Sequence, residues 1–258
     1  MWKSKWNTMT LINPETKKTW NISVDGDSIT TQLDSRKPKT ITDELPNMKS
    51  SGLIIAQMKK GFIYSDPDAN DWEPYYHTFL NRGYTGFMPI ATNKKRSDFY
   101  VFRVENQFED EIILHFNSEG KMLDRYHLGK DRMTYRALLL DDGNIVLHSA
   151  YSAYNKKFIE LFDPNNESLS EVHDEELIHI FDTHDDHVDI LKKYKVSYLG
   201  YNDPYNRGIF KVEDTKDTSL VSEFYNEFVS KNAFCAFSSN SLIIHTDNGV
   251  LSLYKIPT

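Results

Sequence analysis

The feature that most constrains the fold is a β-hairpin signature that recurs along the chain. In 138–148, LLLDDGNIVLH, two apolar runs flank an Asp-Gly turn, where glycine permits the positive φ angle that a tight strand reversal needs. The same pattern recurs at 112–123, with Gly120 in the turn, and at 242–254, with Gly249 in the turn. These repeated glycine turns between apolar runs predict a mainly β fold built from antiparallel hairpins.

Four groups of strands are expected in the second part of the chain, at 87–128, 135–172, 196–225 and 233–256. Their leading strands are about 40 to 60 residues apart, which is close to the repeat of four-stranded propeller blades. The sequence therefore predicts a propeller-like domain over 75–258. A β-sandwich remains the alternative, because short strands separated by regular turns fit it too. A third possibility is that the N-terminal hairpin completes the ring.

The N-terminal quarter predicts a small separate module over 1–65. Its expected order is β-β-β-α, with the elements at 9–12, 19–24, 28–33 and 48–60. The helix is predicted because apolar residues recur at helical spacing and because Gly61 follows two lysines, as at many helix ends. The acidic, turn-rich stretch 65–72 is expected to link the two domains.

Three short motifs in this module match a known family: LIN at 11–13, KTWNI at 18–22 and KGF at 60–62. On these residues the module resembles the WGR domain of bacterial proteins of the molybdate metabolism regulator type. The Trp-Gly-Arg tripeptide itself is lacking, because the corresponding stretch, 31–36, reads TQLDSR, and Arg36 alone corresponds to it. The resemblance implies contact with nucleic acid, since in DNA-repair relatives the Trp and Arg meet a DNA end.

Charge is distributed unevenly along the chain. The formal net charge is −8, but residues 1–65 contain ten Lys/Arg and six Asp/Glu, so they carry +4 and the remainder carries −12. A positive module attracts polyanions, whereas the acidic remainder repels them. The candidate nucleic-acid-binding residues are Lys17, Lys18, Arg36, Lys37 and Lys39.

The densest group of metal-ligating residue types is the His/Asp loop 182–189, DTHDDHVD, expected between a short apolar strand and a helix. Imidazole and carboxylate groups at this spacing can bind Zn²⁺ or another divalent ion. The order Asp-x-His-x-Asp-His resembles the metallo-β-lactamase motif with its first histidine replaced, which implies a metal-dependent hydrolase. The alternative is a solvated loop whose histidines hydrogen-bond locally. The candidate ligands are Asp182, His184, Asp186 and His187.

Other sequence features bear on compartment and chemistry. The single cysteine, Cys235, excludes an internal disulfide and favours a reducing compartment. No apolar run approaches the roughly 18 residues that a membrane helix needs, so the sequence predicts a cytoplasmic protein without a membrane partner. The phosphate-binding loops of nucleotide enzymes and the Gly-x-Ser-x-Gly elbow of serine hydrolases are also lacking.

These observations predict a non-enzymatic binding protein whose loops recognise a macromolecular partner. A protein partner is expected, with nucleic acid as a further candidate through the basic N-terminal module. No cofactor is expected apart from the candidate divalent metal. Two alternatives stay open: a metal-dependent hydrolase that uses the His/Asp loop, and an acidic immunity or inhibitor protein that neutralises a basic enzyme.

Overall fold

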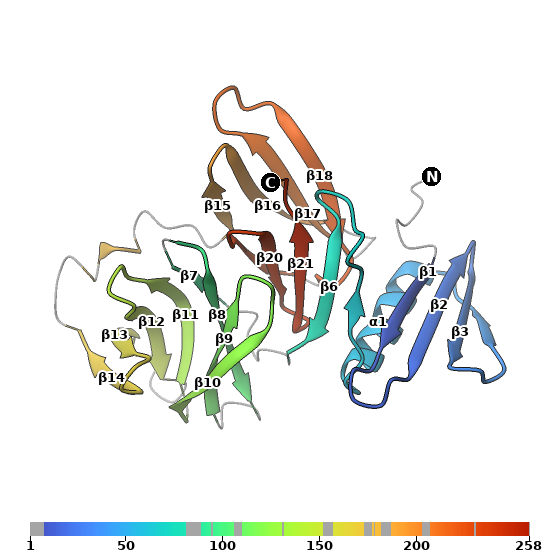
Figure 1. The fold of residues 1–258 in the computed structure, drawn as a ribbon, viewed down its shortest axis with the longest axis horizontal. Coiled ribbons are helices and arrows are strands. Elements are labelled where there is room, and N and C mark those ends of the chain that lie inside the picture. Colours follow the sequence, from blue (N-terminus) through green and yellow to red (C-terminus); the bar gives the residue numbers. More distant parts are fainter. Residues whose placement is uncertain are drawn as a thin grey trace.

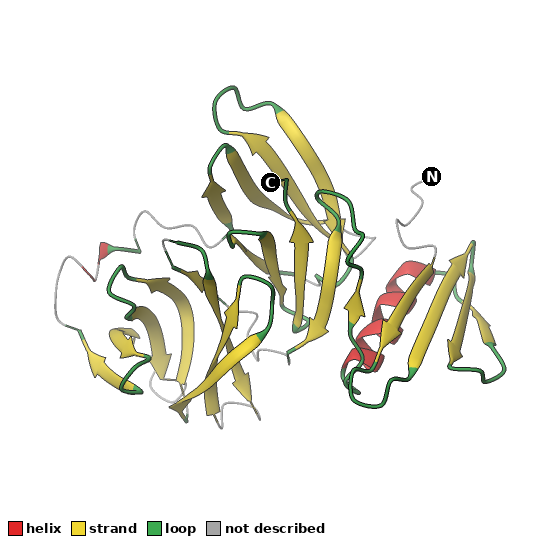
Figure 2. Ribbon diagram, in the orientation of Figure 1, coloured by secondary structure: helices red, strands yellow, loops and turns green. Residues whose placement is uncertain are grey.

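The computed structural model describes residues 8–80, 89–93, 95–105, 110–130, 132–151, 157–172, 177, 179–181, 187–202, 207–229 and 231–257. The described chain is mainly β, as predicted, and its strands form five antiparallel sheets (Figures 1 and 2). None of the described helical segments is long and apolar enough to cross a bilayer.

The first sheet and its helix form the N-terminal module. They comprise β1 (Thr8–Ile12), β2 (Thr19–Asp25), β3 (Ser28–Leu33), β4 (Lys39–Thr42) and α1 (Pro46–Met58). Burial alternates along β1 and most of β2, so one sheet face packs against α1 and the other faces solvent. The predicted helix is confirmed two residues earlier, and Gly61, with φ +83°, follows its end.

The predicted β-β-β-α order of this module was wrong by one strand. The basic segment after β3 was expected to be a loop up to the helix, but Lys39 to Thr42 form β4, which pairs with β3. All four residues of β4 are exposed. A fully exposed edge strand has no alternation of apolar and polar residues, so the pattern that reveals other strands is missing here.

The remaining four sheets, here called blades 1 to 4, confirm the four predicted groups of strands. Blade 1 contains β7 (Ile90–Thr92), β8 (Asp98–Glu105), β9 (Asp110–Asn117) and β10 (Met122–Gly129). Blade 2 contains β11 (Arg132–Leu139), β12 (Ile145–Tyr151), β13 (Lys157–Asp163) and β14 (Ser168–Glu171). Blade 3 contains β15 (Val188–Leu191), β16 (Tyr194–Asn202), β17 (Arg207–Asp214) and β18 (Leu220–Asn226).

Blade 4 is closed by a strand from an earlier part of the chain. It contains β19 (Ala233–Phe237), β20 (Ser241–Thr246), β21 (Val250–Lys255), β6 (Pro74–Phe79) and β5 (Tyr64–Ser65). β6 pairs antiparallel with β21, with Phe79 opposite Val250 and Tyr76 opposite Leu253. The closing strand is therefore β6, and the N-terminal hairpin belongs to the first sheet instead of forming a blade.

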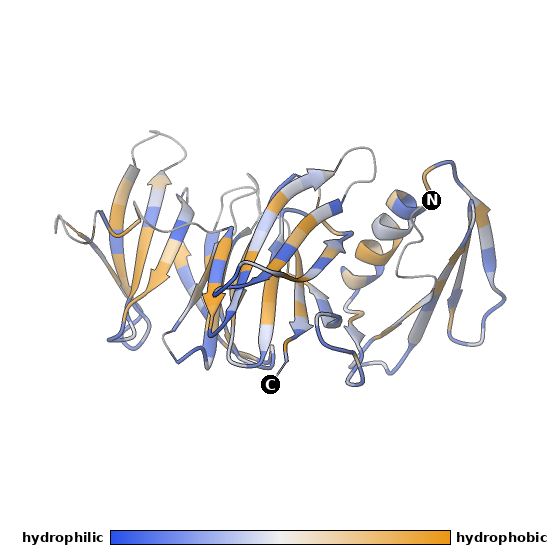
Figure 3. Ribbon diagram, turned by 90° about the horizontal axis from the view of Figure 1, so that it is seen from above, coloured by the Kyte–Doolittle hydropathy of each residue, from blue (hydrophilic) through white to orange (hydrophobic). Residues whose placement is uncertain are grey.

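Blade 1 packs against blades 4 and 2 through opposite faces of its strands, and Figure 3 shows hydrophobic residues along the strands. On β8, Phe99 and Val101 face blade 4, whereas Tyr100 and Phe102 face blade 2. Blades 3 and 4 share another cluster, in which Phe210 is fully buried. The first strands of all four blades line one central cavity, so the arrangement is propeller-like.

The N-terminal module packs directly on blade 4. Its apolar cluster, which includes Ile54 and Met58 of α1, also contains Phe79, Phe228 and Val250. α1 lies between the first sheet and β6 (Figure 1). The backbones of Ile12 and Ile63 exchange two hydrogen bonds of 2.8 and 2.9 Å. The first sheet and blade 4 therefore share a continuous hydrophobic core.

Two local predictions around the His/Asp loop were wrong. Leu177 and His179 are helical, although the run 177–181 was expected to be a strand. The segment after the loop was expected to be a helix but forms β15. Short apolar runs do not distinguish a helix from a strand on their own, so contacts with distant parts of the chain decide which of the two forms.

Candidate functional site

The five predicted nucleic-acid-binding residues lie together at one end of the first sheet. Because β1 to β4 pair in sequence order, the β1–β2 and β3–β4 turns lie at the same end. Thr19 N donates to Asp34 Oδ1 at 2.7 Å, and Asp34 N donates to Thr19 O at 2.8 Å. These turns present an exposed cationic surface, here called the basic turns: Lys17, Lys18, Arg36, Lys37 and Lys39.

Asn13 fixes the conformation of the first of these turns. Its Oδ1 accepts hydrogen bonds from Glu15 N at 3.1 Å and from Thr16 N at 2.8 Å. Its Nδ2 donates to Lys60 O at 3.2 Å, which places the end of α1 beside the turn. Lys17 follows with φ 59°, a left-handed backbone conformation that residues other than glycine rarely adopt without such support.

Cations outnumber carboxylates on the basic turns. Glu15 and Asp34 are the acidic residues of the two turns, so the segments 13–18 and 34–39 carry a net charge of +3. Asp34 accepts a hydrogen bond from the backbone N–H of Thr19, so one of its carboxylate oxygens is engaged by the first sheet. Exposed lysines and an arginine on rigid turns can bind phosphate groups without rearrangement of the backbone.

The predicted metal site falls largely outside the described residues, which exclude Asp182, His184 and Asp186. The fourth candidate, His187, has Nδ1 2.9 Å from Ala233 O, so this nitrogen carries a proton and donates to the carbonyl. Within the described ranges, no group of three or more His, Cys, Asp or Glu side chains is arranged to hold a metal ion.

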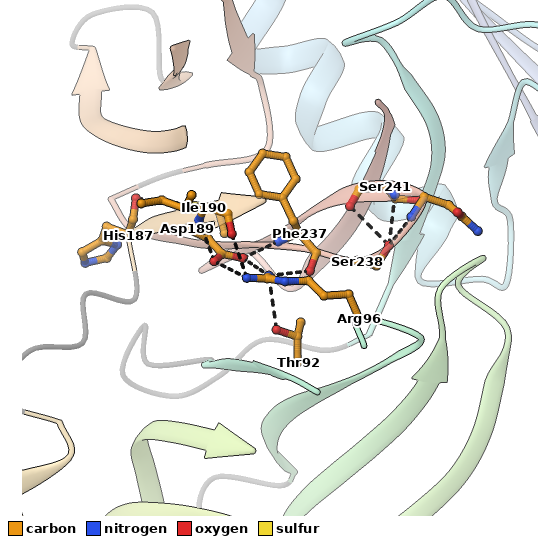
Figure 4. A network of polar contacts seen from close by, with 10 residues as sticks. Thr92, Arg96, His187, Asp189, Ile190, Phe237, Ser238 and Ser241 are labelled. Atoms are coloured by element: carbon orange, nitrogen blue, oxygen red, sulfur yellow. Dashed lines mark hydrogen bonds and ion pairs between the residues drawn. The ribbon is translucent and has the colours of Figure 1, made fainter. Parts of the chain in front are cut away.

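Asp189, the last residue of the His/Asp loop, belongs to a polar network near the propeller axis (Figure 4). The guanidinium of Arg96 binds both carboxylate oxygens, and Nη2 lies 2.8 Å from Oδ1. Arg96 also donates to Phe237 O at 2.8 Å and Ile190 O at 2.9 Å, and Phe237 N donates to Asp189 at 2.7 Å. One side chain from the β7–β8 turn thus joins blades 1, 3 and 4.

A small cavity of about 70 Å³ lies beside this network on the axis. Each blade contributes to its lining, with Ala91, Leu139, Asp189 and Cys235 among the lining residues. This volume holds about two water molecules. Cys235 Sγ donates to His187 O at 3.2 Å, and its side chain is buried, which agrees with a core cysteine.

A second polar cluster is buried between blades 1 and 2. Arg132 Nε lies 3.3 Å from Glu111 Oε2, and its Nη1 lies 3.1 Å from Glu160 Oε1. Thr134 Oγ1 donates to Glu111 at 2.9 Å, and Ser149 Oγ lies 3.3 Å from Arg132 Nη2. Burial raises the pKa of both glutamates, and the charge of Arg132 offsets this only in part.

Sequence reasoning missed both polar clusters. Glu111 offered a signal, because it stands directly before the apolar run 112–114, where a charged side chain is expected to be paired. Arg96 offered none, since it lies in a short turn among other charged residues and its partner is 93 positions away. Long-range ion pairs leave no local pattern in a single sequence.

Comparison with known proteins leaves the chain without an assigned family. No protein-family model matches the chain, and no curated protein matches it in sequence. Solved structures similar to it include *Kuenenia stuttgartiensis* hydrazine synthase, at 12% identity and TM-score 0.25, covering 95% of this chain and 57% of that chain. The AtxE2 isopeptidase matches at 8% identity and TM-score 0.29, covering 92% of this chain and 40% of that chain.

The selenomethionine form of virginiamycin B lyase from *Staphylococcus aureus* is similar over most of both chains. The match has 11% identity and TM-score 0.28, and it covers 98% of this chain and 97% of that chain. The first two matches extend over about half of those longer chains. TM-scores this low do not establish a shared fold, so the fold assignment rests on the strand pairing and the packing of the blades.

Proposed function

We propose that this protein is a cytoplasmic, non-enzymatic binding protein that contacts nucleic acid through the basic turns. The observation that supports the proposal is the pair of hydrogen bonds between Thr19 and Asp34, which hold two cationic turns side by side. Five exposed cations at one end of a rigid sheet form a surface suited to the phosphate backbone. The resemblance to the WGR domain supports the same binding surface, with Arg36 in the role of the family's arginine.

The charge of the rest of the molecule supports one orientation of binding. The chain beyond residue 65 carries −12, so it repels a polyanion, whereas the N-terminal module attracts one. Contacts of lysine and arginine with phosphates carry little sequence information. We therefore propose binding that depends strongly on salt and weakly on sequence, with the propeller displaying loops for other partners.

The test is the salt dependence of binding to a fluorescein-labelled 20-base-pair DNA duplex and to an RNA duplex of the same sequence. The variant Lys17→Glu/Arg36→Glu/Lys37→Glu removes three cations from the basic turns. Each lost phosphate contact reduces the slope of log K against log salt by about 0.9, so the triple variant is expected to lose roughly 2 to 3 units of slope.

The matched control is Lys121→Glu/Lys130→Glu/Lys216→Glu, which makes the same change of net charge at exposed positions on the blades. It is expected to weaken binding far less than the triple variant of the basic turns. Absence of binding to both duplexes at about 50 mM salt would refute the proposal, as would equal losses in the two triple variants.

A further inference from the structure

The middle of the first sheet, on the face that points away from α1, carries uncharged polar side chains. On the opposite face, Leu11, Ile22 and Ile29 are buried against α1, and side chains alternate between the two faces along each strand. The strand pairing arranges the outward residues in rows that run across the sheet. The middle of the face contains two of these rows: Thr10, Asn21 and Gln32, and then, farther from the basic turns, Thr8, Ser23, Thr30 and Thr40.

The row of Thr10, Asn21 and Gln32, here called the amide row, presents N–H donors to solvent. Thr10 Oγ1 donates to Asn21 Oδ1 at 2.7 Å, which orients this amide and leaves Nδ2 without an acceptor among the described residues. Gln32 Nε2 donates one N–H to Arg36 O at 3.0 Å, and its second N–H is likewise available. Both amides are half-buried, so their positions are restricted while a ligand can still reach them.

The amide row adjoins the basic turns. The hydrogen bond from Gln32 to Arg36 O joins it directly to the β3–β4 turn. Asn21 follows Lys18 by three residues, which corresponds to about 10 Å of extended chain. A ligand with a repeating anionic backbone that lies on the basic turns therefore reaches both amides.

The charge of the first sheet changes sign from one end to the other. At the end opposite the basic turns, the segments 25–28 and 42–45 contain four carboxylates and neither Lys nor Arg. Asp43 N donates to Asp27 O at 3.0 Å, so these two segments lie side by side. A polyanion is attracted to the basic turns and repelled from the acidic end, which confines it to the half of the face that holds the amide row.

The described part of the first sheet has no exposed ring on which the bases of a single strand could stack. Trp20 is the one aromatic residue of 8–42, and it is only 4% exposed. Proteins that bind single strands stack bases on aromatic side chains, whereas side-chain amides and hydroxyls commonly donate to the phosphate oxygens of a duplex. The face therefore suits an intact duplex that is contacted through its backbone.

We infer that a nucleic-acid duplex crosses this end of the first sheet, with its sugar-phosphate backbone held by the basic turns and by hydrogen bonds from Asn21 and Gln32. The inference rests on the function proposed above and adds to it a set of contacts that carry no charge. Loss of an uncharged contact lowers affinity without changing the number of counterions released, so its signature differs from that of a lysine.

The first test is the double variant Asn21→Ala/Gln32→Ala, titrated with the labelled DNA duplex at several salt concentrations. Affinity is expected to fall about tenfold, because two hydrogen bonds to phosphate oxygens are lost. The slope of log K against log salt should stay within about 0.3 of the wild-type slope, because no cation is removed. A loss of slope of about one unit or more would assign the effect to the basic turns and overturn the inference.

The matched control is Ser28→Ala/Thr42→Ala, which removes two paired hydroxyls from the same face beside the acidic end. It is expected to change affinity less than about twofold, since the duplex does not reach this row. Melting temperatures equal to that of the wild type establish that both double variants are folded. Equal effects of the two double variants, with wild-type binding intact, would overturn the inference and leave the proposed function standing.

A gain of affinity tests the location independently of folding. Asn21→Lys adds a cation within the footprint and is expected to strengthen binding and to steepen the slope by about 0.9, whereas Thr42→Lys at the acidic end should leave the slope nearly unchanged. Equal effects of the two added lysines would contradict the proposed path of the duplex.

The separated strands of the duplex supply the last comparison. The duplex is expected to bind more tightly than either strand alone, because the face offers backbone contacts and no stacking platform. Tighter binding of a single strand would overturn the inference. Failure of the wild-type protein to bind any duplex would refute the proposed function and this inference together.

Discussion

His77 illustrates how one buried side chain links the closing strand to the rest of the core. It lies on β6, its Nδ1 is 2.8 Å from Ser252 Oγ, and its ring contacts the rings of Tyr64 and Phe228. Asn226 Nδ2 donates to the same hydroxyl oxygen at 3.2 Å. Burial lowers the pKa of His77 from 6.5 to about 3.

This lowered pKa predicts a specific pH dependence of stability. Below pH 6.5 the unfolded chain binds a proton at this histidine, whereas the folded protein does not until about pH 3. The free energy of unfolding should therefore fall by about 1.4 kcal/mol per pH unit between pH 6 and 4 from His77 alone. Urea titrations at several pH values should show that His77→Gln reduces the slope of the free energy of unfolding against pH.

Arg132 predicts a large effect of a single substitution. It separates two buried carboxylates, so Arg132→Met leaves Glu111 and Glu160 without their cation. Removal of one partner of a buried ion cluster typically destabilises a fold by about 3 to 5 kcal/mol. Urea unfolding at pH 7 measures this loss, and the exposed Arg125→Met serves as control. A loss below about 1 kcal/mol would show that the charge of the two carboxylates is compensated without Arg132.

At the scale of elements, the two glycines of the N-terminal helix region predict opposite effects of alanine. Gly52→Ala should raise the free energy of unfolding by about 0.5 to 1 kcal/mol, because the position is helical and open. Gly61→Ala should lower it by a similar amount or more, because φ is +83° and a Cβ would lie 3.3 Å from Asn13 Nδ2. Thermal unfolding of both variants provides the comparison.

Elements with a local signature were predictable from the sequence, and elements defined by distant partners were not. The turn around Gly143 specifies the β11–β12 hairpin by itself, because few residues other than glycine adopt its φ of +93°. β4 was missed because its identity comes from pairing with β3. The basic turns were named residue by residue, but their proximity follows from sheet order. Arg96 and its network depend on blade packing, which no local pattern encodes.

At the scale of the whole molecule, ring closure predicts the order of hydrogen exchange. β6 is paired with β21 and covered by the N-terminal module, whereas β10, β14 and β18 are the last strands of their sheets. Amides of β6 should therefore exchange more slowly than those of the other three strands. Peptide-resolved exchange mass spectrometry measures this order. Faster exchange in β6 would mean that the propeller opens first where β6 pairs with β21.

The pairing of β6 with β21 also has a consequence for synthesis on the ribosome. Phe79 leaves the exit tunnel long before Val250, its partner in the closed blade, has been translated. At about 5 to 20 residues per second, the emerging strand waits on the order of ten seconds or more with an unpaired edge. During that interval the N-terminal sheet can assemble from contiguous segments, while the nascent propeller stays open and accessible to chaperones.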